Sequence, residues 1–152
     1  VPTELNKDFS KVITRAEFSK LAVMLYEKLN GPITPTITFS DTTNIYVRKA
    51  ATIGIVSGTG NGKFNPNGEL KREHAAKIVD QVAQVLGIPS KTGKLAYADN
   101  NKIAEWAKPF VASVGANKLM TGEANNKFNP KGKYTRRQSI VTLMRVYDAV
   151  NK

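Results

Sequence analysis

Residues 54–73 read GIVSGTGNGKFNPNGELKRE, and a diverged copy of this stretch returns at residues 118–137. Both copies keep a glycine, a phenylalanine, a proline and an arginine at the same places: Gly58 and Gly122, Phe64 and Phe128, Pro66 and Pro130, Arg72 and Arg136. A third, partial copy lies near the start, where residues 13–17 align with residues 70–74 and 134–138. The spacing of 57 to 64 residues is too long for short solenoid repeats and suits a few packed supersecondary units.

The repeat divides the chain into three expected modules, at residues 1–36, 37–90 and 91–152, of which the first is incomplete. Apolar residues recur at helical spacing in three long segments, residues 14–30, 72–86 and 136–150. Shorter helical patterns precede the two glycine-rich loops, at residues 41–54 and 106–114. A unit of helix, tight loop and helix therefore predicts a mainly α fold.

The composition is that of a globular domain, because 41% of the 152 residues are hydrophobic and 23% are charged. No apolar run approaches the roughly 20 residues of a membrane-spanning helix. Residues 1–4 do not read as a signal peptide, so we expect that one was removed or that the sequence is part of a longer protein. The chain has no cysteine and a single histidine, His74, so we expect no metal, no cofactor and no enzymatic activity.

The net charge of +11 is concentrated in the last module, which carries twelve basic and four acidic residues. Such a surface attracts polyanions, whether nucleic acid or the anionic polymers of a bacterial wall. No helix is concentrated in lysine and arginine, which disfavours the nucleic-acid alternative. A third alternative is a module that assembles surface arrays through protein contacts alone.

In each of the three long helices, an arginine directly follows the expected N-cap residue. Thr14 and Glu17 have the spacing of a capping box, as do Thr135 and Gln138. Capping does not require arginine, and a cation at the first helical position opposes the helix macrodipole. Arginine beside helix N-terminal amides does offer a bidentate site for carboxylate or phosphate. We therefore predict anion contacts at Arg15, Arg72 and Arg136.

The glycine-rich loops favour a turn over a phosphate or calcium site. The copy at residues 122–126 has lost most of the glycines of residues 58–62, and neither loop contains an aspartate. We expect the phenylalanine that follows each loop to fill the core, and Gly58 and Gly122 to let a ligand approach the backbone.

Three other residues carry predictions of their own. Asp41 and Asp99 begin the second and third modules and are typical of turns or caps. Trp106 has a side chain suited to stacking on a sugar ring, but its helical spacing with Phe110 favours core packing.

These motifs together resemble the S-layer homology domain of bacterial surface proteins. The resemblance rests on Phe39-Ser40-Asp41, on residues 54–58, on residues 62–66 and on the arginine-led helix that follows. Thr14-Arg15-Ala16-Glu17 matches the most characteristic tetrapeptide of that family without change. One half repeat and two complete repeats account for essentially the whole chain.

The resemblance implies a three-pronged, pseudo-threefold helical domain that holds a secreted protein on the cell wall or in the S-layer without a covalent bond. Such domains bind secondary cell-wall polysaccharides, often through a pyruvylated sugar, in grooves between modules. Peptidoglycan is a further candidate partner. The implied ligand-binding residues are the tetrapeptide arginines, the residues that frame them and the two glycines: Arg15, Arg72, Arg136, Thr14, Glu17, Thr135, Gly58 and Gly122.

The sequence also departs from the family pattern. The second and third tetrapeptides, at residues 71–74 and 135–138, are altered, so the groove built on each is expected to be weakened or changed. The first helix of the first module is missing, which predicts either an upstream extension or a second chain that fills the gap. Replacing Arg15 by Ala is expected to weaken polymer binding while changing stability by no more than about 0.5 kcal/mol.

Overall fold

The computed structural model describes residues 2–152. Its α-helices are α1 (Arg15–Asn30), α2 (Ile45–Thr52), α3 (Arg72–Val85), α4 (Lys108–Ala116) and α5 (Arg136–Val150). Single 3₁₀ turns complete the order: η1 (Thr3–Leu5), η2 (Asn100–Lys102), η3 (Glu105–Ala107) and η4 (Ala124–Asn126). The β pairing within the described residues is limited to isolated bridges, so the prediction of a mainly α fold is confirmed.

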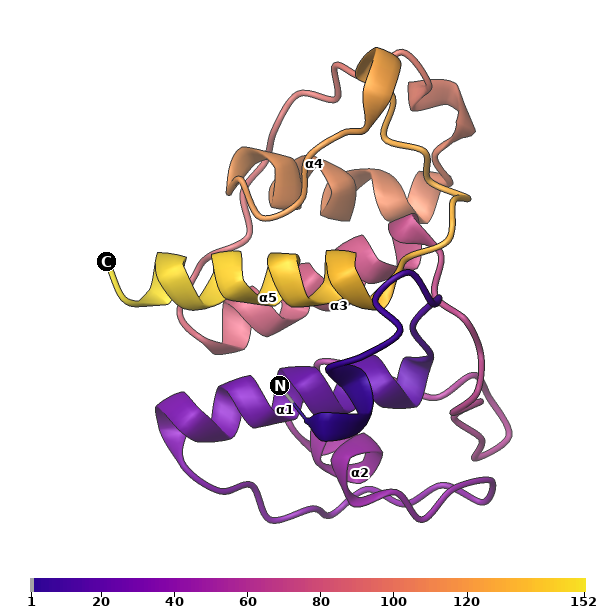
Figure 1. Ribbon diagram of the computed structural model, residues 1–152, viewed down its shortest axis with the longest axis vertical. Coiled ribbons are helices and arrows are strands. Elements are labelled where there is room, and N and C mark those ends of the chain that lie inside the picture. Colours follow the sequence, from indigo (N-terminus) through magenta and orange to yellow (C-terminus); the bar gives the residue numbers. More distant parts are fainter. Residues whose placement is uncertain (1) are drawn as a thin grey trace.

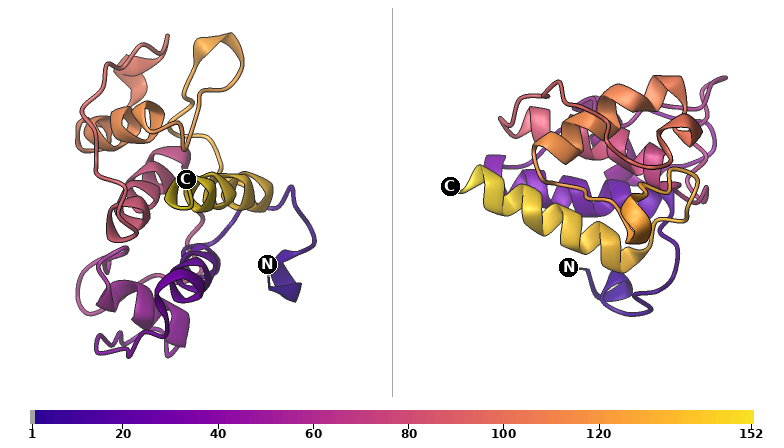
Figure 2. Two further views of the ribbon diagram at one scale, coloured as in Figure 1. Left: turned by 90° about the vertical axis from the view of Figure 1, so that its left-hand side faces the viewer. Right: turned by 90° about the horizontal axis from the view of Figure 1, so that it is seen from above.

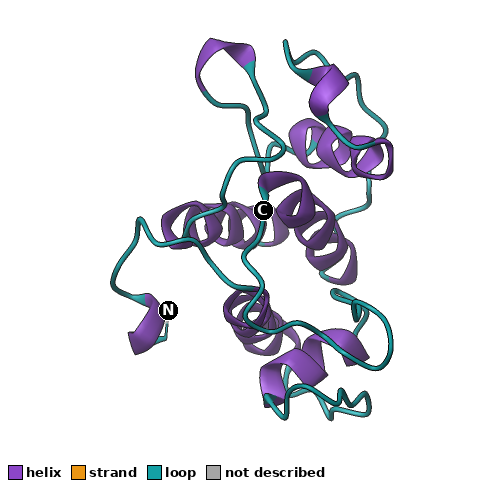
Figure 3. Ribbon diagram, turned by 90° about the vertical axis from the view of Figure 1, so that its right-hand side faces the viewer, coloured by secondary structure: helices purple, strands orange, loops and turns teal. Residues whose placement is uncertain are grey.

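The long helices α1, α3 and α5 lie in the middle of the molecule, and the short helices α2 and α4 lie outside them (Figures 1 and 3). α2 packs on α1 and α4 packs on α3, while α5 contacts both other long helices. Figure 2 shows the N-terminal segment beyond α5, on the side away from α4. Across residues 2–152, no helix combines the length and the apolar character that crossing a membrane requires.

Side-chain caps start two of the three long helices. The Thr14 hydroxyl accepts the amide of Glu17 at 3.1 Å, and the Glu17 carboxylate accepts the amide of Thr14 at 3.0 Å. Thr135 and Gln138 exchange the same two bonds at 3.2 and 3.0 Å. Both predicted capping boxes are confirmed, whereas Lys71 makes no side-chain cap at the start of α3.

The three module copies meet in a closed ring of backbone hydrogen bonds. The amide of Ile13 donates to the carbonyl of Tyr134 at 2.8 Å, and the amide of Tyr134 donates to Leu70 at 3.0 Å. The amide of Leu70 donates back to Ile13 at 3.1 Å, and all three residues are buried. The ring places the starts of α1, α3 and α5, with their arginines, at the module boundaries. The pseudo-threefold arrangement of the whole domain stays a prediction, as do the module bounds.

The N-terminal segment reproduces the end of the glycine-rich loop. Asp8 has a positive φ of 51°, as do its counterparts Asn65 at 60° and Asn129 at 59°. The amide of Lys11 donates to the Asp8 carbonyl at 2.9 Å, and the two other copies repeat this turn at 3.1 and 3.0 Å. Residues 8–11 therefore form the same turn as residues 65–68 and 129–132. Asp and Asn tolerate this left-handed conformation better than most residues.

Asp41 and Asp99 accept hydrogen bonds from the loops, although they lie 23 to 30 positions earlier in the sequence. The Asp41 carboxylate accepts the amides of Phe64 and Asn65, both at 2.8 Å, and Asp99 accepts those of Phe128 and Asn129, both at 2.9 Å. The hydrogen bond from the backbone amide of Phe64 is the main cause that lowers the pKa of Asp41. Burial alone would raise the pKa of Asp99, but the hydrogen bonds from the backbone amides of Phe128 and Asn129 lower it below its ordinary value. Both phenylalanines are fully buried, as predicted.

Candidate functional site

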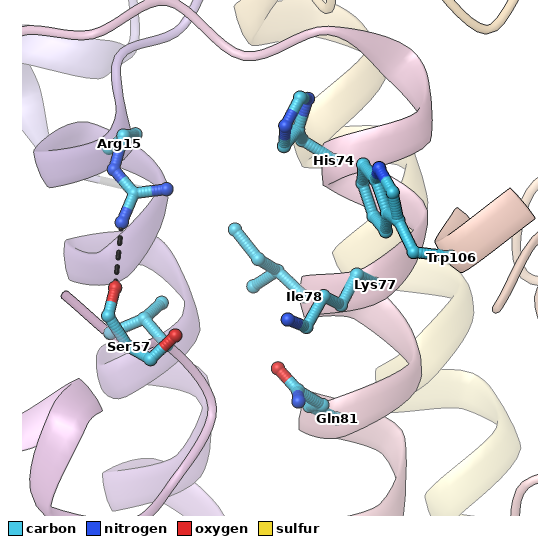
Figure 4. A pocket seen from close by; sticks show the side chains of 8 residues that line it. Arg15, Ser57, His74, Lys77, Ile78, Gln81 and Trp106 are labelled. Atoms are coloured by element: carbon cyan, nitrogen blue, oxygen red, sulfur yellow. Dashed lines mark hydrogen bonds between the residues drawn. The ribbon is translucent and has the colours of Figure 1, made fainter. Parts of the chain in front are cut away.

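The first groove lies where the first and second modules meet, and it has a volume of about 220 Å³. Its lining comes from the start of α1, the loop after α2, one face of α3 and the turn before α4: Arg15, Val56, Ser57, His74, Lys77, Ile78, Gln81 and Trp106. Figure 4 shows Arg15 and Ser57 on one side, facing His74, Lys77 and Gln81 on α3. No acidic residue lines it, so the groove is cationic.

Arg15 enters this groove from the first turn of α1. Its Nε donates to the carbonyl of Phe64 at 3.0 Å, and its Nη2 donates to the carbonyl of Ser57 at 2.8 Å. The guanidinium also lies over the Phe64 ring, 4.5 Å from the ring centre. Burial lowers the pKa of Arg15, but a guanidinium stays charged at neutral pH. Two of its five N–H donors hold the loop, and the group remains half-buried at the groove wall.

These contacts revise the expected effect of removing Arg15. The sequence predicts a surface arginine whose loss changes stability very little. The structure instead shows a side chain that joins two modules through the carbonyls of Phe64 and Ser57. Each such hydrogen bond to a charged donor stabilises by about 1.5–3 kcal/mol at most. We therefore expect Arg15→Ala to lower stability as well as binding.

The opposite wall of the first groove is one face of α3. His74, Lys77 and Gln81 follow one another at helical spacing, which places their side chains along one stripe. The rings of His74 and Trp106 lie 5.0 Å apart at an angle of 50°. Burial is the main cause that lowers the pKa of His74, so the imidazole is neutral at pH 7.

Trp106 is not in the core, so the prediction of core packing is wrong. The side chain is 44% exposed and forms part of the groove lining. Trp106 belongs to the turn η3, and α4 begins only at Lys108, with Pro109 in its first turn. Trp106 and Phe110 therefore do not lie on one face of a single α-helix, and their spacing does not predict that Trp106 is buried.

The second groove lies where the second and third modules meet, and it has a volume of about 230 Å³. Its lining is Arg72, Met120, Thr121, Gly122, Glu123, Tyr134, Arg137, Gln138, Val141, Thr142 and Arg145. Six of these residues stand 64 positions after first-groove residues, and Arg72 stands 57 positions after Arg15. The two grooves are therefore copies of one another.

Arg72 repeats the contacts of Arg15 in a more enclosed setting. Its Nε donates to the carbonyl of Phe128 and its Nη2 to that of Thr121, both at 2.8 Å. The guanidinium lies 4.8 Å from the centre of the Phe128 ring. Arg72 is only 4% exposed, and Glu123 approaches its Nη1 at 3.4 Å. An acidic counter-charge thus stands beside Arg72 and has no equivalent in the first groove.

Arg136 is enclosed by the N-terminal segment and is 5% exposed. Its Nη1 donates to the carbonyls of Glu4 and Lys7, both at 3.3 Å, and its Nη2 donates to Glu17 at 2.5 Å. Glu17 therefore serves α1 as a capping residue and Arg136 as a counter-ion. Of the three predicted arginines, Arg15 is the most accessible.

Packing explains why residues 58 and 122 are glycine. A Cβ at Gly58 would lie 2.7 Å from the carbonyl oxygen of Lys63 and 3.0 Å from the Phe39 ring. A Cβ at Gly122 would lie 2.7 Å from the Tyr97 ring. Gly122 also lines the second groove, while the predicted ligand contact at both glycines stays a prediction.

The described residues contain no cluster of histidine, cysteine and carboxylate side chains that could hold a metal ion. Each groove combines a fixed guanidinium with polar side chains on an adjacent helix, and the first groove adds an exposed indole ring. A fixed guanidinium of this kind favours an anionic group.

Two segments of the chain match a known protein family. Residues 38–76 and 96–138, together more than half of the chain, match the model of the S-layer homology domain. The chain belongs to the S-layer homology family. The S-layer protein of Bacillus thuringiensis subsp. finitimus is 34% identical over 108 residues, which cover 70% of this chain and 12% of that protein.

Two further relatives carry enzyme names. Exoglucanase XynX of Acetivibrio thermocellus is 28% identical over 160 residues, covering 98% of this chain and 14% of that protein. Amylopullulanase of Thermoanaerobacterium thermosulfurigenes is 27% identical over 147 residues, covering 93% of this chain and 8% of that protein. This chain thus spans only a small part of each relative. An S-layer homology domain is a binding module, and the match indicates a cell-surface or S-layer location and anchoring there.

Proposed function

We propose that this chain anchors a secreted protein to the bacterial cell wall by binding an anionic secondary cell-wall polysaccharide, and that it has no catalytic role. The observation that carries the proposal is the pair of grooves at equivalent module boundaries, each built around a recurring arginine. Two copies of one site on a single chain suit a polymer, because a second bound segment adds to the first through effective concentration.

A pyruvylated sugar is the ligand that we infer. A ketal-linked pyruvate presents a carboxylate on a compact ring, and guanidinium binds carboxylates with good geometry. In the first groove the carboxylate would lie near Arg15, with Lys77 as a second cation. Trp106 would then offer its exposed face to the sugar ring. The absence of acidic lining residues favours an anion at this site.

Co-sedimentation with Gram-positive cell-wall sacculi tests the proposal. Sacculi are used before and after acid extraction, which strips the secondary polymers and leaves peptidoglycan. Binding should be lost on stripping and should weaken about tenfold in Lys77→Ala, which removes a groove cation without touching the Arg15 contacts. Lys91→Ala is the matched control, because it removes the same charge from an exposed site outside both grooves.

Other results would reject the proposal. Equal binding to stripped walls would assign the grooves to peptidoglycan. Equal losses in Lys77→Ala and Lys91→Ala would indicate attraction to bare charge. Binding to duplex DNA would favour the nucleic-acid alternative instead. Its affinity should then fall about tenfold per phosphate contact for each tenfold rise in salt concentration.

A further inference from the structure

A cavity of about 300 Å³ lies on the third module, between α4 and the segment that joins α3 to α4. We call it the α4 pocket. Its lining residues are Gly93, Lys94, Leu95, Ala96, Tyr97, Val111, Ala112, Gly115, Ala116 and Asn126. As the described residues line them, the pocket and the two grooves share no side chain. The wall that α4 contributes consists of small apolar residues.

The second module shows how the equivalent space is filled beside α2. The Thr52 hydroxyl accepts the backbone amides of Thr36 and Ile37 at 2.9 and 3.3 Å. The Nε of Arg48 donates to the carbonyl of Ile37 at 3.0 Å. Two polar side chains of α2 therefore bind the segment that precedes this helix. Both are replaced by alanine 64 positions later, in α4.

The third module has kept the preceding segment and lost these two side chains. Lys94 and Leu95 stand 58 positions after the two residues whose amides bind the threonine. Ala116 takes the place of that threonine and offers no side-chain oxygen to the two amides. The lost guanidinium is replaced in part, because the side chain of Asn100 donates to the carbonyl of Leu95 at 2.7 Å. The amides of Lys94 and Leu95 thus lack the acceptor that the second module supplies.

The α4 pocket does not arise from a segment that stands away from its helix. A Cβ at Gly93 would lie 3.0 Å from the carbonyl oxygen of Ala112 and 3.3 Å from the Cβ of Ala116. The backbone at Gly93 therefore touches α4 directly. The volume of the pocket comes instead from the two side chains that became alanine.

Tyr97 adds a hydroxyl to the lining. This oxygen would lie 3.6 Å from a Cβ built on Gly115, so it reaches the α4 wall. Phe39 has the same place in the second module and carries no hydroxyl. Burial raises the pKa of Tyr97, so the hydroxyl stays protonated at neutral pH and can donate a hydrogen bond.

These features select one class of chemical group. Two adjacent amides need an acceptor oxygen, and the small apolar wall of α4 suits a methyl group beside that oxygen. The acetamido group of an amino sugar joins a carbonyl oxygen to a methyl group. Among the described residues that line the pocket there is no arginine, so a carboxylate would not meet a guanidinium there as it does in the grooves.

We propose that the α4 pocket binds the acetamido group of an N-acetylated amino sugar. The acetamido oxygen accepts the amides of Lys94 and Leu95, as the Thr52 hydroxyl accepts their counterparts. The methyl group packs on Val111 and the neighbouring alanines, and Tyr97 donates to a hydroxyl of the sugar ring. That the ligand is a sugar rests on the proposed function, because a wall polysaccharide supplies such rings, whereas the pocket itself is independent of the grooves.

Titration of the ¹⁵N-labelled chain with free N-acetylglucosamine tests the α4 pocket without any wall polymer. With the sugar raised to about 50 mM, we expect shifts of the amide signals of Lys94, Leu95 and Gly115, with a Kd on the order of 1 mM. Glucose carries a hydroxyl in place of the acetamido group and should leave these signals unchanged. Sodium acetate, which offers a carboxylate beside a methyl group, should also leave them unchanged.

Two variants that restore residues of the second module locate the site. Ala112→Arg combined with Ala116→Thr fills the pocket, so it should abolish the shifts while Tm stays the same or rises. Tyr97→Phe removes only the hydroxyl and should weaken sugar binding about fivefold. It decides the question if the filled variant does not fold.

Four results would overturn the proposal. These are no shift at the highest sugar concentration, equal shifts with glucose or acetate, shifts that persist in the filled variant, and shifts confined to the groove residues Arg15 and Trp106. The outcome is separate from that of the sacculi assay. Loss of wall binding to stripped sacculi depends on the grooves, whereas the free sugar reports on the α4 pocket alone.

Discussion

The two grooves share one frame and differ in the side chains that face a ligand. In both, an arginine donates to two loop carbonyls and lies over a buried phenylalanine ring. The walls have diverged, since Lys77 is replaced by Val141 and Gln81 by Arg145. Glu123 adds a counter-charge to the second groove, and Trp106 adds a ring to the first.

This comparison separates two roles of the recurring arginine. The contacts common to both copies join modules, so they account for the recurrence of arginine by structure alone. Ligand binding depends on what remains accessible after those contacts are made. The first groove keeps an accessible guanidinium and no acidic neighbour, so we expect it to bind anions more tightly than the second.

The largest expected effect is on the free energy of unfolding, and it differs between Arg72 and Arg15. Arg72→Ala should lower the free energy of unfolding by about 3 kcal/mol, because it leaves two loop carbonyls and a buried ring without their partner. Arg15→Ala should cost about 1–2 kcal/mol, since Arg15 is more exposed to water. Urea unfolding with unchanged m-values would measure both. Equal losses would mean that exposure does not separate the two arginines.

Trp106→Ala should weaken wall binding about tenfold, because the stacking surface for a sugar ring is lost from the first groove only. Trp106→Phe should retain most of the affinity. Phe9→Ala is the control, because Phe9 is an aromatic residue 38% exposed outside both grooves. The comparison fails if Trp106→Ala binds stripped and intact sacculi as the unmodified chain does.

Local patterns in the sequence were enough to predict the helices. The capping box of Thr14 and Glu17 depends on residues three positions apart, and the burial of Phe64 follows from its place in a repeated loop. Trp106 was misread because Pro109 starts a new helix, which breaks the periodicity that joined Trp106 to Phe110.

The different settings of the three arginines could not be predicted. Arg136 is enclosed by Glu4 and Lys7, which are about 130 positions away in the chain. Such contacts depend on how the modules close, and no spacing pattern encodes them. The turn at Asp8 did leave a signal, since an aspartate there replaces the asparagine at the same place in both other copies.

Glu123→Gln should strengthen binding of isolated wall polysaccharide about threefold at low salt. The change removes the negative charge 3.4 Å from Arg72 and keeps the size of the side chain. Asn129 and Gln138 donate to different oxygens of Glu123, so the glutamine amide retains an acceptor for one of them only. The gain should disappear at about 1 M salt, where the screening length falls to roughly 3 Å. Titration calorimetry at both salt concentrations would measure it. An unchanged affinity at low salt would show that the second groove does not contribute to binding.

The smallest expected effect is a pH dependence that only the first groove can show, because Gln138 stands in the second where His74 stands in the first. Burial lowers the pKa of His74 from its ordinary value of 6.5, so the folded state takes up this proton at a lower pH than an exposed histidine does. The imidazolium adds a cation beside Lys77, so binding of an anionic polymer should rise by less than about threefold between pH 7 and pH 5. Stability should change in the opposite sense, because a lowered histidine pKa favours the folded state above pH 6.5 and this contribution is lost as pH falls. His74→Gln should abolish both trends, and a pH profile that survives this substitution would assign the titration to the ligand.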